Sequence, residues 1–181
     1  INASNGVLTF ISTPDYEIKT SYTATVTATD GSNPSTQIIS VNVSDVDDVA
    51  PTITSPSTFS AAENQTLIGT VTATDVDTDN SSITFSISGS ELAIGSSNGV
   101  LTFNSAPDYE ATSSYTATVT ASDGTNSTTQ SITVNVTNLN DNTPSITSSA
   151  SFSAAENQTS IGTVTAIDAD GSFVRAGHVA A

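Results

Sequence analysis

The sequence predicts an all-β protein made of tandem, seven-stranded, Greek-key β-sandwiches of the immunoglobulin-like kind. Three observations predict it: a 93-residue repeat, short runs in which apolar residues alternate with Thr and Ser, and turn signals such as Asn98-Gly99 and Asp123-Gly124 between the runs. Alternation with a period of two residues is typical of half-buried strands, and the size and rhythm of the repeat match an immunoglobulin-like sandwich. A β-solenoid is less favoured because its rungs repeat over shorter periods.

The repeat divides the chain into units. Asn5–Phe10 returns as Asn98–Phe103, and Ala61–Thr66 returns as Ala154–Thr159, each time 93 residues further along. This register predicts four segments: the C-terminal part of a repeat at 1–48, a complete repeat at 49–141, the N-terminal part of a third repeat at 142–171, and an atypical, disordered tail at 172–181. Only the complete repeat is expected to fold well alone.

Each strand of the complete repeat is predicted from a run of alternating apolar and polar residues that lies between two turns. Ile83, Phe85 and Ile87, for example, share one face of a run whose other face is Thr and Ser. The seven predicted strands cover about 52–60, 66–74, 82–88, 91–95, 99–104, 114–122 and 129–138. Tyr115, like its counterpart Tyr22, opens its strand on the apolar side and is expected in the core.

The composition excludes several classes of function. The chain has 18 Asp and Glu against 2 Lys and Arg, a net charge of −16 at pH 7, so nucleic acid and direct membrane insertion are not expected. The sequence has no Cys, which excludes disulfides, zinc thiolate sites and thiol nucleophiles. It has no Ser–His–Asp arrangement, P-loop or dinucleotide fingerprint, and we predict that it is not an enzyme.

The acidic residues gather at strand ends rather than along the polar strand faces. If successive strands are antiparallel, the bottom of one repeat meets the top of the next at each linker. The carboxylates expected at the first junction are Asp15, Glu17, Asp45, Asp47, Asp48, Asp75, Asp77 and Asp123. Those expected at the second junction are Glu63, Asp108, Glu110, Asp141, Asp168 and Asp170, accompanied by Asn138, Asn140 and Asn142.

So many carboxylates in one crevice repel one another strongly. Either several of their pKa values rise or a cation is bound. Numerous oxygen ligands suit Ca²⁺, which takes roughly 6–8 oxygens, whereas Mg²⁺ keeps its waters and Zn²⁺ prefers Cys and His. The sequence therefore predicts Ca²⁺ as the cofactor, more than one ion at each junction, and these acidic residues with Asn140 as the ligands.

Several short motifs then carry a family resemblance. Ala62-Glu63-Asn64 is similar to a PEN motif, Asp75-Val76-Asp77 to DxD, Asp108-Tyr109-Glu110 to LDRE, Ala121-Ser122-Asp123-Gly124 to AxDxG, and Asn138-Leu139-Asn140-Asp141-Asn142-Thr143-Pro144 to DxNDNxP. Asp45-Val46-Asp47-Asp48-Val49-Ala50-Pro51 is a similar linker. In this order and spacing, residues 1–171 resemble the cadherin repeat, in the bacterial cadherin-like form found in large surface or secreted proteins.

The resemblance implies an extracellular or cell-surface protein that acts in cell adhesion, with Ca²⁺ making the junctions rigid. It also implies a backbone carbonyl ligand at Asn80, and roles for Asp30 and Glu156 in further junctions. The implied partners are neighbouring repeats of the same chain and other surface proteins or glycans; homophilic adhesion is suggested by the family. Two residues depart from the pattern: Val49 replaces an Asn that is expected to ligate through its carbonyl, and Asn138 replaces an Asp, so the second junction is expected to bind Ca²⁺ more weakly.

Two other functions stay open. One is a carbohydrate-binding module of a secreted or surface protein, although such sites usually need exposed aromatic residues and the sequence has no Trp. The other is an inert sandwich spacer without metal, which the clustering of carboxylates makes less attractive.

Overall fold

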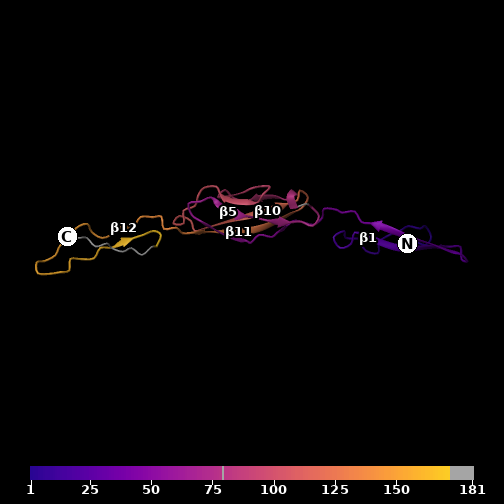
Figure 1. The fold of residues 1–181 in the computed structure, drawn as a ribbon, viewed down its shortest axis with the longest axis horizontal. Coiled ribbons are helices and arrows are strands. Elements are labelled where there is room, and N and C mark those ends of the chain that lie inside the picture. The colour runs from indigo at the N-terminus through magenta and orange to yellow at the C-terminus, as the bar shows by residue number, and fades with distance from the viewer. Residues whose placement is uncertain (79, 172–181) are drawn as a thin grey trace.

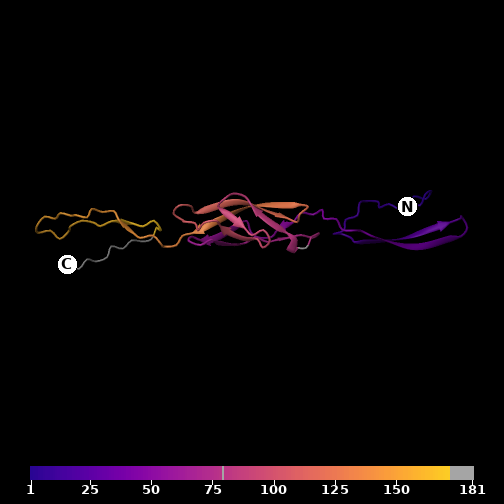
Figure 2. The same cartoon turned by 90° about the horizontal axis from the view of Figure 1, so that it is seen from above.

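The computed structural model describes residues 1–78 and 80–171, and the predicted tail at 172–181 lies outside them (Figure 1). The molecule is elongated, with a central sandwich between an N-terminal hairpin and a C-terminal extended segment (Figure 2). Within the described residues the elements are strands apart from one short 3₁₀ helix, η1 (Asn80–Ser82), which confirms the all-β prediction. No helix in that part of the chain is long and apolar enough to cross a membrane.

The central sandwich has two main sheets, which lie in separate layers (Figure 2). The first has the strand order β4-β11-β10-β7, with β4 at Thr58–Ala62, β7 at Thr84–Ile87, β10 at Ser114–Ser122 and β11 at Ser127–Thr137. The second has the order β5-β9-β8, with β5 at Leu67–Thr70, β8 at Leu92–Ile94 and β9 at Val100–Phe103. β4 pairs with β11 in parallel and the other pairs in these sheets are antiparallel, as expected if the first and last strands of the unit run the same way.

Two of the predicted strands are interrupted. The run 52–60 divides into β3 (Thr52–Ile53) and β4, and the run 66–74 divides into β5 and β6 (Ala73–Thr74). β3 pairs with β6, and the N–H groups of Thr54 and Ser55 both point to the carbonyl of Thr72. Because the next residue, Pro56, has no N–H to donate, the chain leaves this pair and crosses to the other sheet as β4. Alternation alone does not reveal such a crossing.

The core lies between the two sheets. All fully buried residues of the described structure fall between Pro51 and Val136, and Leu101, Val119 and Val134 are completely buried. The Phe103 and Tyr115 rings meet edge to face with their centroids 5.2 Å apart, and Tyr115 packs against the core as predicted.

The predicted Asn98-Gly99 turn brings two strands close together. Gly99 has a φ of +64°, and a Cβ at this position would collide with the carbonyl oxygen of Val71. The N–H of Val71 in turn donates to the Gly99 carbonyl at 2.8 Å. Glycine is therefore required here both for the left-handed backbone and for the close approach.

The two flanking segments repeat parts of this sandwich without its core. β1 (Ser21–Thr29) and β2 (Pro34–Asn42) form a hairpin in the same register as β10 and β11. β12 (Ser145–Ile146) and β13 (Ala166–Ile167) pair in the same register as β3 and β6. Below, residues 49–141 are called the central unit, and residues 1–48 and 142–171 the N-terminal and C-terminal half-units; this division follows the repeat and stays a prediction.

The repeat offers a matched test of the core. Replacing Leu101, whose side chain is 0% exposed, by Ala should lower the free energy of unfolding of the central unit by about 2–5 kcal/mol, because it removes apolar contact and leaves a cavity. The same change at its counterpart Leu8, which is 46% exposed, should stay within about 0.5 kcal/mol. Urea unfolding of the full chain measures both values, and equal losses would contradict the assignment of the core.

Candidate metal centres at the two junctions

The first junction is organised by hydrogen bonds between the linker and the loop after β6. One carboxylate oxygen of Asp77, Oδ2, accepts the backbone N–H groups of Asp48 and Val49 at 3.0 and 2.7 Å. Asp75 Oδ1 accepts the N–H groups of Asp77 and Thr78 at 2.8 and 3.1 Å. The loop is thus folded around its own carboxylates, and the linker is tied to it.

The opposite oxygens of these carboxylates have no hydrogen-bond partner. Asp75 Oδ2, Asp77 Oδ1 and Asp123 Oδ2 are buried and unpaired. Asp123 follows the same pattern as the other two, because its Oδ1 accepts the N–H groups of Thr125 and Asn126 at 2.7 and 2.6 Å. A buried carboxylate oxygen without a partner is costly, and a hard divalent cation offsets that cost. The donor set therefore fits Ca²⁺.

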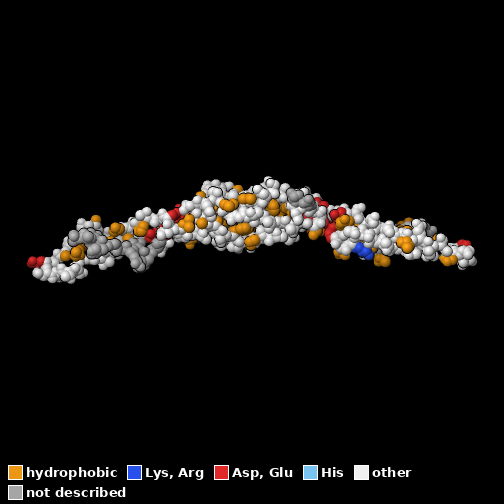
Figure 3. Space-filling model, in the orientation of Figure 1, with side chains coloured by type: hydrophobic (Ala, Val, Ile, Leu, Met, Phe, Trp, Pro, Cys, Tyr) orange, Lys and Arg blue, Asp and Glu red, His pale blue; other side chains and the backbone are white. Residues whose placement is uncertain are grey.

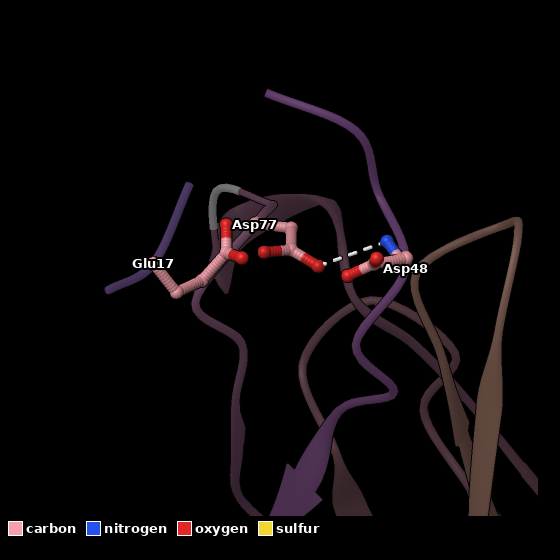
Figure 4. Close-up of side chains that lie close together, drawn as sticks. All are labelled: Glu17, Asp48 and Asp77. Atoms are coloured by element: carbon pink, nitrogen blue, oxygen red, sulfur yellow. Dashed lines mark hydrogen bonds between the residues drawn. The ribbon is translucent and has the colours of Figure 1, made fainter. Parts of the chain in front are cut away.

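Carboxylates from two units and their linker meet at this point. Oxygens of Glu17, Asp48 and Asp77 all lie within 4.8 Å of one another, and Figure 4 shows Asp77 between the other two, with its hydrogen bond from the Asp48 backbone. A hydrogen bond from its own backbone lowers the pKa of Glu17, but loss of hydration and the nearby charges of Asp77 and Asp45 outweigh it, so the pKa is raised. The repulsion expected from the sequence is present.

Two other carboxylates predicted for the first junction, Asp45 and Asp47, lie beside this cluster, and a third, Asp15, does not. Asp45 is near enough for its charge to act on Glu17, and Asp47 receives weak hydrogen bonds of 3.3–3.4 Å from the Asn126 amide to its carbonyl and carboxylate. Asp15 stands apart, because it is not in the cluster and its Oδ1 accepts the N–H of Ile18 within its own turn.

At the second junction the buried group is Glu63. Its side chain is 2% exposed, and its two oxygens accept the N–H of Tyr109 at 2.8 Å and the N–H of Leu139, in the linker, at 2.6 Å. Glu63, Asp108 and Glu110 form one cluster of oxygens within 4.8 Å. Two backbone N–H groups thus hold the Glu63 carboxylate, and one of them, that of Leu139, belongs to the linker.

A second cluster shares Glu110 with Asp141 and Asp170. Here the Asn142 side-chain amide donates to Asp170 Oδ1 at 2.8 Å, to Asp141 Oδ1 at 3.0 Å and to Glu110 Oε2 at 3.2 Å. The Asn142 side-chain and backbone donors lower the pKa of Asp170. The pKa of Glu110 is raised, mainly by loss of hydration and then by the charges of Glu63 and Asp170.

The remaining residues predicted for the second junction contribute in other ways. Asp168 Oδ1 accepts the N–H of Asp170 at 3.0 Å, as Asp75 does for Asp77. Asn140 is exposed in the linker, and the Asn138 amide reaches the Asp170 carbonyl at 3.5 Å. Their assignment as metal ligands stays a prediction.

Three asparagines in these junctions have roles in the structure that the sequence did not predict. Asn126 connects the loop of Asp123 to the linker, Asn64 donates its amide to Asp141, and Asn80 accepts the N–H of Asp75 through its side chain, at 2.8 Å. The repeat held a signal for the first two, since Asn33 and Asn157 stand 93 residues away from them.

Some carboxyl groups of the chain have raised pKa values and others have lowered ones. The free energy of unfolding should therefore depend on pH in one way without calcium and in another way with calcium. A carboxyl with a raised pKa destabilises the folded state once it is ionised, so protonation of Glu17 and Glu110 should first stabilise the calcium-free chain as the pH falls below neutrality. At lower pH, the groups with lowered pKa, Asp170 and Asp30, must be protonated, and their stabilisation is lost as the pH falls through their folded pKa values.

With calcium present, protons compete with the ion, and stability should fall throughout the same acidification. Melting curves recorded against pH, in calcium-free buffer and in calcium, measure the two profiles. Glu17→Gln should remove part of the initial rise. Parallel profiles in the two buffers would contradict this expectation.

The space-filling view shows where the acidic side chains gather. On the visible face, red Asp and Glu side chains lie mainly at the two narrow regions on either side of the central unit and at the tips of the molecule (Figure 3). The surface of the central unit between the two junctions is mostly uncharged in this view.

Comparison with known proteins identifies the repeat. Residues 57–137 match the family model of the cadherin domain. Over 161 residues the chain is 33% identical to the protocadherin-like wing polarity protein stan of Drosophila melanogaster, covering 79% of this chain and 4% of that protein. It is 34% identical over 155 residues to human protocadherin Fat 4, covering 80% of this chain and 3% of that protein. The chain thus spans only a small part of the curated relatives.

Solved structures agree in fold. Extracellular cadherin domains 3–6 of protocadherin gamma B2 superpose with a TM-score of 0.72 at 28% identity, covering 87% of this chain and 46% of that one. Domains EC22–24 of mouse cadherin-23 superpose with a TM-score of 0.64 at 27% identity, covering 87% and 56%. These neighbours confirm the sandwich fold and support the predicted extracellular location. Taken with the matched family model, they show that the chain is a non-enzymatic member of the cadherin repeat family.

Proposed function

We propose that this chain is a calcium-binding segment of an extracellular adhesion protein, in which Ca²⁺ holds consecutive repeats in a rigid line. The observation that carries the proposal is the convergence, at each junction, of carboxylates from one unit, from the linker and from the next unit. The unpaired oxygens of Asp75, Asp77 and Asp123 support it further, because protein donors leave these oxygens free.

The residues that would hold the ions follow from this placement. At the first junction they are Glu17, Asp48 and Asp77, with Asp45, Asp47, Asp75 and Asp123 around them; Asp15, which stands apart from the cluster, stays a predicted ligand. At the second they are Glu63, Asp108, Glu110, Asp141 and Asp170, with Asp168 and Asn140. Bound Ca²⁺ supplies positive charge that offsets the repulsion among these groups and connects both units to the linker. The hydrogen bonds from Asp48 and Val49 to Asp77 already hold the first linker in place.

The two junctions should differ in affinity. At the second, the Asn142 amide occupies oxygens of three carboxylates and must be displaced from them before they can ligate an ion. At the first, Val49 has no such amide, and several carboxylate oxygens are free. Together with the replacement at Asn138, this favours tighter binding at the first junction.

Carbohydrate binding, the alternative function, gains no support from the matched family, and adhesion fits it better. We propose two kinds of partner for this segment. The neighbouring repeats of the same chain contact it at the junctions, and a second adhesion protein of the same family is its partner in adhesion.

Calcium titration by isothermal calorimetry tests the proposal. Asp77→Asn keeps an oxygen that can accept the N–H groups of Asp48 and Val49 but removes the charge, so the affinity of the first junction should fall at least about tenfold. Asp141→Asn should affect only the second junction. Glu91→Gln, an exposed acid outside both junctions, is the matched control and should bind as the unaltered chain does. Absence of heat and of saturable uptake in the unaltered chain would overturn the proposal.

A further inference from the structure

The two junctions share one arrangement of carboxylates but differ in the linker residue beside it. Each junction holds a set of three carboxylates whose oxygens lie within 4.8 Å of one another. The members correspond one to one, 93 residues apart: Glu17, Asp48 and Asp77 at the first junction, and Glu110, Asp141 and Asp170 at the second. The residue that follows Asp48 is Val49, whereas the residue that follows Asp141 is Asn142.

The backbone of this linker residue makes the same contact at both junctions. The Val49 N–H donates to Asp77 Oδ2 at 2.7 Å, and the Asn142 N–H donates to Asp170 Oδ2 at 2.8 Å. The linker therefore enters both clusters in the same way. What distinguishes the two positions is the side chain, which is an isopropyl group at the first junction and a carboxamide at the second.

The Asn142 side chain connects three parts of the second junction. Its amide nitrogen donates to Asp170 Oδ1 at 2.8 Å, to Asp141 Oδ1 at 3.0 Å and to Glu110 Oε2 at 3.2 Å. These acceptors belong to the C-terminal half-unit, the linker and the central unit. The two amide hydrogens are shared among three ionised acceptors, and hydrogen bonds to ionised groups are the stronger kind. The amide thus holds together the carboxylates that a cation would hold together.

The charges of the two linkers differ in the same direction. The first linker has an acid at three positions where the second has one acid and two amides: Asp45, Asp47 and Asp48 correspond to Asn138, Asn140 and Asp141. Repulsion among the carboxylates of a cluster grows with each added charge in it or beside it. Without an ion, the first junction therefore combines the greater repulsion with a linker side chain, that of Val49, that has no group to donate.

We propose that the Asn142 amide is a built-in substitute for the cation, which keeps the second junction largely aligned at low calcium while the first junction becomes the hinge. The inference rests on the proposed calcium function. The amide and the ion compete for the same oxygens, so Asn142 both weakens calcium binding and limits the loss of stiffness when the ion leaves. As calcium falls, the second junction loses its ions first but bends less, and the first then opens as the main flexible joint.

Distances measured across each junction of the full chain test the hinge. The sequence has no Cys, so pairs of introduced cysteines can carry nitroxide labels at chosen positions. Asn42→Cys with Thr52→Cys spans the first junction, and Asn135→Cys with Ser145→Cys spans the second at corresponding, exposed positions. Double electron–electron resonance should give a narrow distance distribution for both pairs in calcium. In EGTA the distribution across the first junction should broaden much more than that across the second.

Asn142→Val is the decisive variant, because it copies Val49 and keeps the backbone N–H. Two opposite effects are expected from it. In EGTA the distance distribution across the second junction should become about as broad as that across the first. In calorimetric titration of the Asp77→Asn chain, which weakens the first junction, the calcium affinity of the second junction should rise at least about threefold, since a competing hydrogen-bond donor is removed. A merely structural residue would lower both stiffness and affinity.

Thr143→Ala is the matched control, since it copies the next residue of the first linker, Ala50, at an exposed position. It should leave both distributions and the calcium affinity unchanged. The reciprocal variant, Val49→Asn, should narrow the distribution across the first junction in EGTA. Equal broadening of the two junctions in the unaltered chain, an unchanged distribution in Asn142→Val, or weaker calcium binding by that variant would each overturn the proposal. Melting of the central unit in every variant checks that it is folded.

The same measurements separate this proposal from the calcium function. If calcium binds and narrows both distributions but Asn142→Val behaves like Thr143→Ala, the role of the amide is wrong and the calcium function stands. If the unaltered chain takes up no calcium, the calcium function fails. A second junction that is narrow in EGTA and broadens in Asn142→Val would then still support the amide as the group that connects the central unit to the C-terminal half-unit.

Discussion

Removing calcium is expected to lower the melting temperature of the chain and to loosen both junctions. A ligand that binds only the folded state adds about 2.7 kcal/mol when its free concentration is about 100 times its Kd. For a domain of this size each kcal/mol corresponds to about 4–8 °C. Calorimetry in calcium and in EGTA measures the shift, and small-angle scattering should show a straight rod in calcium and a distribution of bent shapes in EGTA.

Ionic strength is the control for this result. Sodium chloride screens exposed charges without occupying a site, so it should recover only a small part of the lost stability. Magnesium should recover less than calcium because it retains its water ligands. If sodium chloride restored the melting temperature as fully as calcium does, the clusters would be only repulsive surfaces and not binding sites.

Among the acidic residues of the two junctions, the largest loss of stability on substitution is expected at Glu63, the buried one. Glu63→Gln keeps one acceptor for the N–H groups of Tyr109 and Leu139 but turns an amide N–H₂ toward the other donor. A buried donor left without an acceptor costs about 1–3 kcal/mol. Urea unfolding in calcium-free buffer should show that loss in the central unit, and calcium should restore less stability than it does in the unaltered chain.

Glu91→Gln is the comparison for this substitution. Glu91 is an exposed acid of the same unit, and its replacement should change the free energy of unfolding by no more than about 0.5 kcal/mol. Equal effects of the two substitutions would contradict the view that the buried Glu63 connects the central unit to its linker.

Much of the fold follows from local patterns in the sequence. Alternation over nine residues located β10 at Ser114–Ser122 without error. One face of that strand is the more buried, and the other the more exposed, along its whole length. Alternation did not show that the run 52–60 changes sheets, since the change depends on Pro56 and on the carbonyl of Thr72, which accepts the last two N–H groups before it. Contacts that are distant in sequence decide where such a strand ends.

The candidate site, like the fold, could be predicted only in part from the sequence. The repeat and the strand directions predicted that carboxylates of two units and their linker meet at each junction, and the structure brings Glu17, Asp48 and Asp77 together from three separate segments. The side-chain roles of Asn64, Asn80 and Asn126 were harder to predict, because an Asn in a chain rich in Asn, Ser and Thr carries no charge signal. Their roles depend on side-chain directions that are set only once the linkers are folded.

The parallel pairing of β4 with β11 has a mechanical consequence. The chain enters the central unit beside the strand through which it leaves, and the two strands run in the same direction over the five pairs from Thr58 and Thr133 to Ala62 and Thr137. A tensile force along the axis therefore loads these backbone hydrogen bonds in shear, all at once, instead of peeling them apart one after another. Such a module is suited to carry tension between two surfaces.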